Sequence, residues 1–314
     1  MRSETFTHTA DDGTAIFVHR WDPDDASSIV AVAHVVHGMA EHSARYARLA
    51  ETLTANGLRV YAHDHRGHGR TAKPEELGHF GDENGWARVV GDLRRVLRRE
   101  MDENPGKPLV VIGHSMGSFM VQQLMYEVPE WISAVVLSAS NGKPTPLASA
   151  GRLVARAERK RLGASGKSPV LRALGFEAFN KAFKPNRTAC DWLSRDEAEV
   201  DKYVADPLCG FECSTSTWVE LLDALAEINR PANQAKIRKD LPVYILAGSE
   251  DPVSEKTKGL YQLLRAYGKA GLTDVTHHFY PGARHEIFNE TNRGEVTHEL
   301  LVWLRSKIPG MPAA

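Results

Sequence analysis

The chain has 314 residues, of which 42% are hydrophobic and 25% are charged, and its formal net charge is -1. These values are typical of a globular protein, and a nearly neutral chain gives no indication of nucleic acid binding. No apolar run approaches the roughly 20 residues of a membrane-spanning helix, and residues 1–8 lack the apolar region of a secretory signal. The cysteine count of 3 is odd and fits reduced thiols, so we expect a cytoplasmic protein.

Strands and helices alternate over the first part of the chain. Residues 6–8 and 15–21 flank the turn sequence Asp11-Asp12-Gly13 and predict a β-hairpin. The elements expected next are, in chain order, a strand at 29–36, a helix at 44–55, a strand at 58–63, a helix at 85–101, a strand at 109–113, a helix at 118–127 and a strand at 132–138. Such alternation predicts an α/β fold with a mostly parallel central sheet and helices on both faces.

The alternation stops between residues 141 and 240, where the pattern indicates helices and loops without a buried strand. Strand patterns return at residues 241–248 and 275–280. Because the helical stretch lies between two predicted strands, we interpret it as an insertion. We therefore expect an α/β core made of residues 1–140 and 241–314, with residues 141–240 as a helical cap over the carboxyl edge of the sheet.

The sequence VVIGHSMGS at residues 110–118 predicts a strand that turns sharply into a helix. The pattern Gly-x-Ser-x-Gly at such a turn places the serine, here Ser115, at the tip of a nucleophile elbow. Gly113 and Gly117 have no Cβ and let the turned backbone pass close to its neighbours. The N-terminus of the following helix would stabilise developing negative charge. The alternative is a Gly/Ser turn that matches the pattern by chance.

Asp251 and His285 each follow a predicted strand, in the chain order serine, acid, histidine that this arrangement requires. Ser115 would attack an acyl carbon, and His285 would take its proton and return it to the leaving group. Asp251 would hold the imidazole in the right tautomer. Taken singly, Asp251 also fits a turn and His285 an ordinary loop histidine, and Glu250 is a rival acid. The occurrence of all three in order at strand ends favours a catalytic triad.

An acyl-transfer site also needs backbone N–H groups that bind the oxyanion. One is expected from Met116, the residue after the nucleophile, and the other from the loop after an early strand. The strand at 29–36 is followed by His37-Gly38-Met39, and we assign the second donor to the amide of Met39.

Five motifs together resemble one family. They are HGMAEHSARY at 37–46, AHDHRGHG at 62–69, GHSMG at 113–117, DPV at 251–253 and GARHE at 282–286. In this order they resemble the monoacylglycerol lipase and bacterial lysophospholipase family of α/β-hydrolases, which is grouped with serine aminopeptidases. The resemblance implies an α/β-hydrolase fold, a lid, a Ser115–Asp251–His285 triad and an oxyanion hole of the Met39 and Met116 amides. Met39 departs from the family pattern, which usually has a small residue there.

Two apolar patterns in the predicted cap bear on the substrate. One stripe at helical spacing is expected to pack the cap onto the core, and it contains Trp218, Leu221, Leu222, Leu225 and Ile228. A less regular, phenylalanine-rich cluster contains Val170, Leu171, Leu174, Phe176, Phe179 and Phe183. From this cluster we select Leu174, Phe176, Phe179 and Phe183 as candidate substrate-binding residues, with plain packing as the alternative.

A basic run in the cap has two interpretations. It contains Arg152, Arg156, Arg159, Lys160 and Arg161. It fits a solvated helix face, which is the favoured interpretation, or a patch that meets anionic lipid head groups at a membrane surface.

We expect neither a metal nor a cofactor. His63, His65 and His68 resemble a metallo-hydrolase run, but Gly67 stands where that run has an aspartate. Cys190, Cys209 and Cys213 lack the paired spacing of a zinc site. A serine-triad hydrolase needs only water as its second substrate.

The sequence thus predicts a carboxylic ester hydrolase that releases a fatty acid from single-chain lipid esters, monoacylglycerol or lysophospholipid. The alternatives are a carboxylesterase on small soluble esters and a serine aminopeptidase. A non-catalytic, ligand-binding relative is least favoured, because a receptor need not keep Ser115, Asp251 and His285. The expected partner is a small lipid or ester substrate, and the sequence predicts no particular oligomeric state.

Overall fold

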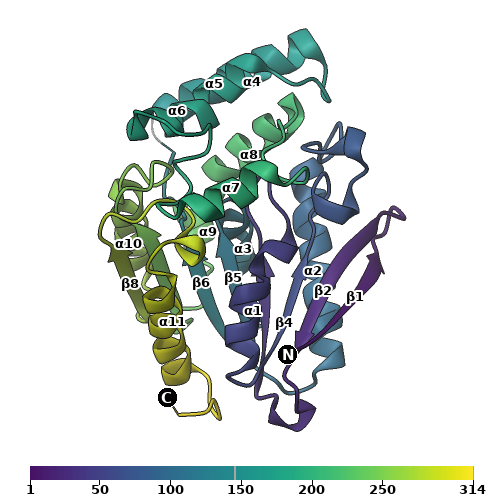
Figure 1. Ribbon diagram of the computed structural model, residues 1–314, viewed down its shortest axis with the longest axis vertical. Coiled ribbons are helices and arrows are strands. Elements are labelled where there is room, and N and C mark those ends of the chain that lie inside the picture. The colour runs from purple at the N-terminus through teal and green to yellow at the C-terminus, as the bar shows by residue number, and fades with distance from the viewer. Residues whose placement is uncertain (145, 314) are drawn as a thin grey trace.

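A computed structural model of the chain describes residues 1–144 and 146–313, so Thr145, in the predicted cap, lies outside the described residues. One 8-stranded sheet runs through the molecule in the order β1-β2-β4-β3-β5-β6-β7-β8 (Figure 1). The strands are β1 (Arg2–Thr9), β2 (Ala15–Asp22), β3 (Ala31–Val36), β4 (Leu58–His63), β5 (Leu109–His114), β6 (Ala134–Ser138), β7 (Val243–Gly248) and β8 (Val275–Tyr280). Among the strand pairs of this sheet in the described residues, β1–β2 and β2–β4 are antiparallel and the others are parallel.

The strand order reverses at β3, because β4 pairs on one side of it and β5 on the other. Loops that leave neighbouring strands in opposite directions open a crevice at the carboxyl edge of a sheet, where α/β proteins bind their ligands. The loop after β3 carries Met39, and the turn after β5 carries Ser115. The topology therefore brings these two sequence-predicted site residues to the same carboxyl edge of the sheet, after neighbouring strands.

Helices cover both faces of the sheet, as Figure 1 shows. The helices on one face are α2 (Gly85–Glu103), α3 (Met116–Glu127) and α10 (Lys258–Ala270), and those on the other are α1 (Ala47–Thr54) and α11 (Arg293–Lys307). All residues of β3, β5, β6 and β7 are buried, which is why these strands appear in the sequence as continuous apolar runs. The predicted α/β fold is confirmed.

Element boundaries shift by a few residues from the prediction. The helix expected at 44–55 begins with a 3₁₀ turn, Ser43–Tyr46, and becomes α1 only at Ala47. The strand expected from residue 241 starts at Val243, because Pro242 has no N–H to donate to the ladder. The elbow helix α3 starts earlier than expected, at Met116.

The segment between β6 and β7 is helical. Its helices are α4 (Pro146–Leu162), α5 (Pro169–Leu174), α6 (Phe176–Asn180), α7 (Glu197–Ala205), α8 (Thr215–Ile228) and α9 (Pro231–Gln234). Figure 1 places α4, α5 and α6 at one end of the molecule, beyond α7 and α8. Leu221 and Ile228 of α8 join the main core, and Val219 packs against Ala155 of α4. The prediction that the Trp218–Ile228 stripe packs the insertion onto the core is confirmed.

No helix in the described part of the chain is long and apolar enough to cross a membrane.

Candidate active site

Ser115 occupies a strained turn between β5 and α3. Its backbone angles are φ 50° and ψ -120°, a region that residues with a side chain rarely adopt. A Cβ on Gly117 would overlap the carbonyl oxygen of Val36, and one on Gly113 would lie 2.7 Å from Cα of Ser118. The close approach that was predicted for both glycines is confirmed. The turn leaves Ser115 partly exposed at the carboxyl edge of the sheet.

Asp251 and His285 meet after β7 and β8. The distance from His285 Nδ1 to Asp251 Oδ1 is 2.9 Å, and both side chains are buried. The same carboxylate oxygen accepts a hydrogen bond of 2.9 Å from the Val253 amide. Because a carboxylate only accepts, Nδ1 carries the proton in neutral His285, and Nε2 is left with a free lone pair. The rival acid Glu250 instead pairs with Lys256 at 2.6 Å.

Burial and the neighbouring negative charges shift the pKa of His285 in opposite directions. Burial disfavours the imidazolium, but attraction to Asp251, the hydrogen bond from Nδ1, and the charges of Glu286 and Glu41 together raise the pKa above its ordinary value. The neighbouring His114 contacts the Ser138 hydroxyl at 3.1 Å and, among the described residues, no carboxylate, and burial lowers its pKa to about 4. The site thus holds one histidine that readily takes a proton beside one that stays neutral.

His285 lies close to His114, the residue before Ser115: the centroids of the two rings are 4.9 Å apart. A Cβ on Gly38 would lie 3.2 Å from Cβ of Ser115, so the loop after β3 also packs against the serine. Among the described residues no hydrogen bond joins Ser115 to the imidazole of His285. Such bonds are often long before substrate binds and tighten in the complex.

The amides of Met39 and Met116 are the two donors that the sequence predicts for an oxyanion. Gly38 N–H donates to Glu41 Oε1 at 2.6 Å, and Ala40 N–H donates to His68 Nε2 at 3.2 Å. Between them, the Met39 amide has no acceptor in the described part of the chain, and neither has the Met116 amide at the start of α3. Two unpaired donors therefore flank Ser115, as an oxyanion hole requires.

A buried ion-pair network that the sequence did not predict links the loop after β3 to the loop of His285. Arg45 Nη1 lies 2.6 Å from Glu41 Oε2, and its two terminal nitrogens lie 2.6 and 2.7 Å from the carboxylate of Glu286. Burial alone would raise the pKa of both glutamates, but the Arg45 guanidinium outweighs it and holds both values below the usual range. Both carboxylates are therefore ionised. Only the spacing of Glu41 and Arg45 by four residues gave a signal in the sequence.

Comparison with known proteins establishes the family. A family model described as serine aminopeptidase, S33, matches residues 27–292. The chain belongs to this family. It is 29% identical over 311 residues to a monoglyceride lipase of Mus musculus, covering 95% of this chain and 89% of that protein. It is also 29% identical over 299 residues to a monoacylglycerol lipase of Mycolicibacterium smegmatis, covering 94% and 95%.

A solved structure supports the fold. A thermostable carboxyl esterase from Bacillus coagulans in complex with glycerol superposes with a TM-score of 0.89, at 24% identity and with 98% of this chain and 99% of that chain covered. The chain is accordingly an α/β-hydrolase of the carboxylic ester hydrolase class.

In this hydrolase, the insertion after β6 reaches the loop that carries Met39. The carbonyl oxygen of Ala40 accepts hydrogen bonds from Tyr203 Oη at 2.8 Å and from the Gly210 amide at 2.9 Å. His42 Nε2 lies 2.9 Å from Asp206 Oδ2. The α7 region thus fixes the outer side of this loop, a long-range contact that local sequence patterns do not predict.

The candidate substrate-binding phenylalanines gather around Trp192, which sequence reasoning missed. Trp192 packs on His285 with ring centroids 4.8 Å apart, and its ring lies 6.0 Å from Phe176 and 5.1 Å from Phe179. Phe183 packs against the same cluster and lies under the guanidinium of Arg284. Leu174 differs from the other candidates because it is 54% exposed.

Two sets of side chains bear on metal binding. The ring nitrogens of His63, His65 and His68 are engaged in hydrogen bonds with protein groups. The ligand atoms of His42, Asp206 and Cys209 lie within 4.8 Å of one another, and in the described residues this is the one such group of three that could hold an ion. The sequence did not single out this second set, since its members are far apart along the chain.

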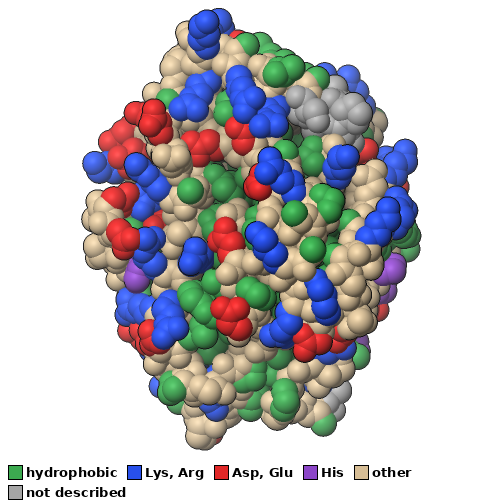
Figure 2. Space-filling view, turned by 180° about the vertical axis from the view of Figure 1, so that it is seen from behind, with side chains coloured by type: hydrophobic (Ala, Val, Ile, Leu, Met, Phe, Trp, Pro, Cys, Tyr) green, Lys and Arg blue, Asp and Glu red, His purple; other side chains and the backbone are tan. Residues whose placement is uncertain are grey.

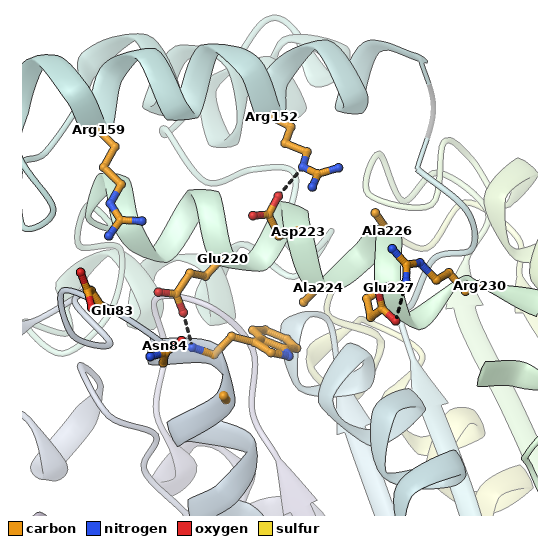
Figure 3. Close-up of a pocket in the computed structure, with 12 residues that line it drawn as sticks. Glu83, Asn84, Arg152, Arg159, Glu220, Asp223, Ala224, Ala226, Glu227 and Arg230 are labelled. Atoms are coloured by element: carbon orange, nitrogen blue, oxygen red, sulfur yellow. Dashed lines mark hydrogen bonds and ion pairs between the residues drawn. The ribbon is translucent and has the colours of Figure 1, made fainter. Parts of the chain in front are cut away.

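A groove of about 590 Å³ lies between α2, α4 and α8 (Figure 3). Its charged side chains largely neutralise one another: Arg152 pairs with Asp223, and Arg230 pairs with Glu227 at 2.9 Å. Glu220 accepts a hydrogen bond from the Trp86 amide at 2.5 Å. None of Ser115, Asp251 and His285 lines this groove, so we do not assign the active site to it.

Proposed function

We propose that the protein hydrolyses single-chain lipid esters, such as monoacylglycerol or lysophospholipid, with Ser115, His285 and Asp251 as a catalytic triad. The observation that carries this proposal is the buried 2.9 Å contact of His285 with Asp251, next to a serine at a strained elbow and two unpaired backbone amides. The names of the mouse and mycobacterial relatives favour monoacylglycerol as the substrate class.

In the proposed mechanism, Ser115 Oγ attacks the ester carbonyl while His285 Nε2 takes the hydroxyl proton. The negative charge that forms on the carbonyl oxygen is bound by the amides of Met39 and Met116, and one such donor is worth about 3 kcal/mol of transition-state stabilisation. Asp251 keeps Nδ1 protonated and stabilises the imidazolium. His285 then protonates the departing alcohol, and water repeats the sequence on the acyl-enzyme.

Phe176, Phe179 and Phe183 support an acyl-binding role for the cap. Each is partly buried and packs on the cluster that contains Trp192, which itself covers His285. A fatty acyl chain that leaves the ester carbon at Ser115 would meet this aromatic surface first. The cap of residues 141–240 is in this proposal the element that recognises the acyl chain.

The outer end of the cap fits contact with a lipid surface. Leu153 is 67% exposed and Leu174 is 54% exposed, and Figure 2 shows Lys and Arg side chains among hydrophobic ones at this end of the molecule. Some of the basic run is engaged within the chain, since Arg156 pairs with Asp223 and Arg161 with Glu158. A peripheral contact would therefore rest more on the exposed apolar side chains than on charge.

Aminopeptidase activity is the second candidate, and the charges near the site disfavour it. An aminopeptidase must bind the ammonium group of its substrate, which calls for an available carboxylate. The two glutamates whose charges raise the pKa of His285, Glu41 and Glu286, are both already engaged in ion pairs with Arg45.

The test is to assay p-nitrophenyl esters and 1-monoacylglycerols of graded chain length beside aminoacyl p-nitroanilides, with Ser115→Ala as the blank. We expect ester hydrolysis that falls by several orders of magnitude in the variant. Cleavage of the anilides without ester hydrolysis would replace the proposal by the aminopeptidase alternative. Near-normal ester turnover by Ser115→Ala would remove the triad assignment.

A further inference from the structure

A line of buried polar side chains crosses the layer between the sheet and α2. Glu100 Oε1 lies 2.7 Å from His34 Nδ1, His34 Nε2 lies 2.9 Å from His63 Nδ1, and His63 Nε2 lies 3.0 Å from His65 Nδ1. His65 Nε2 ends the line, 3.1 Å from the carbonyl oxygen of His37. None of the four side chains is more than 1% exposed. We call Glu100, His34, His63 and His65 the relay.

The surroundings of the relay are mostly apolar. Val32, Tyr61, Val96 and Leu97 belong to the core on this face of the sheet. The titratable groups that act on the relay from neighbouring elements are His8 on β1, Tyr61 on β4, Arg99 and Glu103 on α2, and His37 and His68 in the loops. A net charge in such a layer would be costly, because burial of an unpaired ion costs several kcal/mol.

The hydrogen bonds of the relay fix its number of protons. The line ends at a backbone carbonyl, which can only accept, and at the carboxyl group of Glu100, which accepts when ionised and donates when protonated. Each of the four hydrogen bonds needs one proton, but three neutral imidazoles supply only three. The fourth proton makes the relay neutral, with either a protonated Glu100 or an ionised Glu100 and one imidazolium.

Two observations place the fourth proton on Glu100. Its second oxygen, Oε2, is buried and has no hydrogen-bond partner in the described residues, an arrangement that is more costly for a carboxylate than for the carbonyl oxygen of an acid. Burial raises the pKa of Glu100, whereas burial and neighbouring histidines lower those of His63 and His65 well below the ordinary value. The acid then donates to His34, and each imidazole donates to the next group in line.

The far end of the relay holds the loop that carries Met39. His65 contacts His37 twice, through Nε2 to the carbonyl oxygen and through its own amide to His37 Nε2 at 3.1 Å, and the two rings are 3.9 Å apart. We infer that Glu100 is a neutral acid and that the relay residues are positioning residues, which fix the His37 carbonyl and thereby the Met39 amide against the substrate oxyanion. The positioning role rests on the oxyanion function proposed for Met39.

Infrared spectroscopy on the full chain tests where the proton is. The difference spectrum of wild type minus Glu100→Gln should contain the carbonyl stretching band of a buried protonated acid at neutral pH. The matched control is Glu103→Gln, since Glu103 lies on the same helix but pairs with Arg99 at 2.7 Å and is 32% exposed. Its difference spectrum should contain only carboxylate bands. Absence of the acid band for Glu100, or the same band for Glu103, would overturn the assignment.

Kinetics test the positioning role. Glutamine keeps an N–H that donates to His34 Nδ1, so Glu100→Gln should retain kcat within about twofold of wild type. Glu100→Leu removes the donor and should lower kcat by roughly tenfold at little-changed KM, because only the transition state uses the Met39 amide. Equal kcat in Glu100→Leu and wild type, or an equal loss in both variants, would overturn the role.

The infrared and kinetic results distinguish a failure of the relay proposal from a failure of the proposed function. The infrared bands are measured without substrate and do not depend on Ser115. A wild-type protein that shows the acid band but hydrolyses no ester would contradict the proposed function and the positioning role, and would leave the proton assignment standing. An active wild type without the band would contradict the relay alone. If Glu100→Leu fails to fold, the isosteric glutamine variant still decides the proton assignment.

Discussion

His285 Nδ1 lies 2.9 Å from Asp251 Oδ1 although the two residues are 34 positions apart, and neither side chain is more than 4% exposed. The contact forms because β7 and β8 are parallel neighbours, so that the loops after them leave the same edge of the sheet. Because both side chains are buried, this carboxylate both orients the imidazole and favours its charged form.

The contact between His285 and Asp251 predicts that substitutions of the adjacent acids Asp251 and Glu250 affect kcat differently. Asp251→Asn should lower kcat by about 10⁴, because the amide favours the wrong imidazole tautomer. Glu250→Gln is the matched control: its carboxylate pairs with Lys256 at the surface, and kcat should change little. Initial rates on a p-nitrophenyl ester measure both. A larger loss in the Glu250 variant would reassign the acid.

The raised pKa of His285 predicts the pH dependence of catalysis. The general base must be neutral, so kcat/KM should rise with pH through the raised pKa, at a higher pH than for an unperturbed imidazole. Asp251 is the largest contributor that raises this value, so the rising limb of any residual activity in Asp251→Asn should move to lower pH. A pH–rate profile of the two proteins decides this, and a limb that does not move would contradict the contribution of Asp251.

The raised pKa of His285 also makes the free energy of unfolding depend on pH. Because His285 binds its proton more tightly when folded, its contribution to the free energy of unfolding is full below the unfolded pKa and is lost as the pH rises through the folded pKa. Urea unfolding of wild type and His285→Gln across this range would reveal a difference between them that shrinks as the pH rises.

Arg45 should matter for stability more than for chemistry. Its guanidinium, 11% exposed, is the cation that the buried Glu41 and Glu286 share. Arg45→Met leaves two buried carboxylates without a cationic partner and should lower the free energy of unfolding by about 3–5 kcal/mol, measured by urea denaturation. Arg48→Met is the control, because Arg48 is 41% exposed in its pair with Glu199 and should cost at most about 1 kcal/mol. Equal losses in the two variants would mean that the ion pairs of Arg45 stabilise the fold no more than a surface ion pair does.

Local sequence patterns predicted strands and the nucleophile elbow. They did not predict the side-chain contacts between residues that are far apart in the chain. The strand at 58–63 was placed correctly because a buried parallel strand is an apolar run between turn residues. The elbow was predictable because Gly113 and Gly117 permit contacts that a Cβ would block. No local pattern predicts that Arg45 contacts Glu286, 241 positions away. His63 and His65 carried a recognisable motif, but whether their rings bind a metal or each other depends on His34 and Glu100, which lie on other elements.

Chelation should not affect activity. The proposed mechanism uses no metal, and the nitrogens of His63 and His65 already bond to protein groups. His42, Asp206 and Cys209 are the alternative ligands. Activity should therefore survive EDTA, and mass spectrometry under native conditions should show no stoichiometric zinc. Loss of activity that zinc restores would contradict this, and His42→Gln would then tell whether the His42 group holds the ion.

The aromatic cluster around Trp192 predicts how rate depends on acyl length. If Phe176 and Phe179 contact the acyl chain, each methylene that becomes buried adds up to about 0.8 kcal/mol, and kcat/KM should rise by up to about fourfold per carbon until the site is full. Phe179→Ser should flatten this rise and leave acetate esters almost unaffected. Val204→Ser is the control, since Val204 lies on α7 in the cap but is 54% exposed, and it should keep the full slope. The measurement is kcat/KM for p-nitrophenyl esters from acetate to palmitate in all three proteins. A preference for acetate or butyrate that neither substitution alters would mean that the phenylalanines only pack the cap, and the small-ester alternative would then account better for the site.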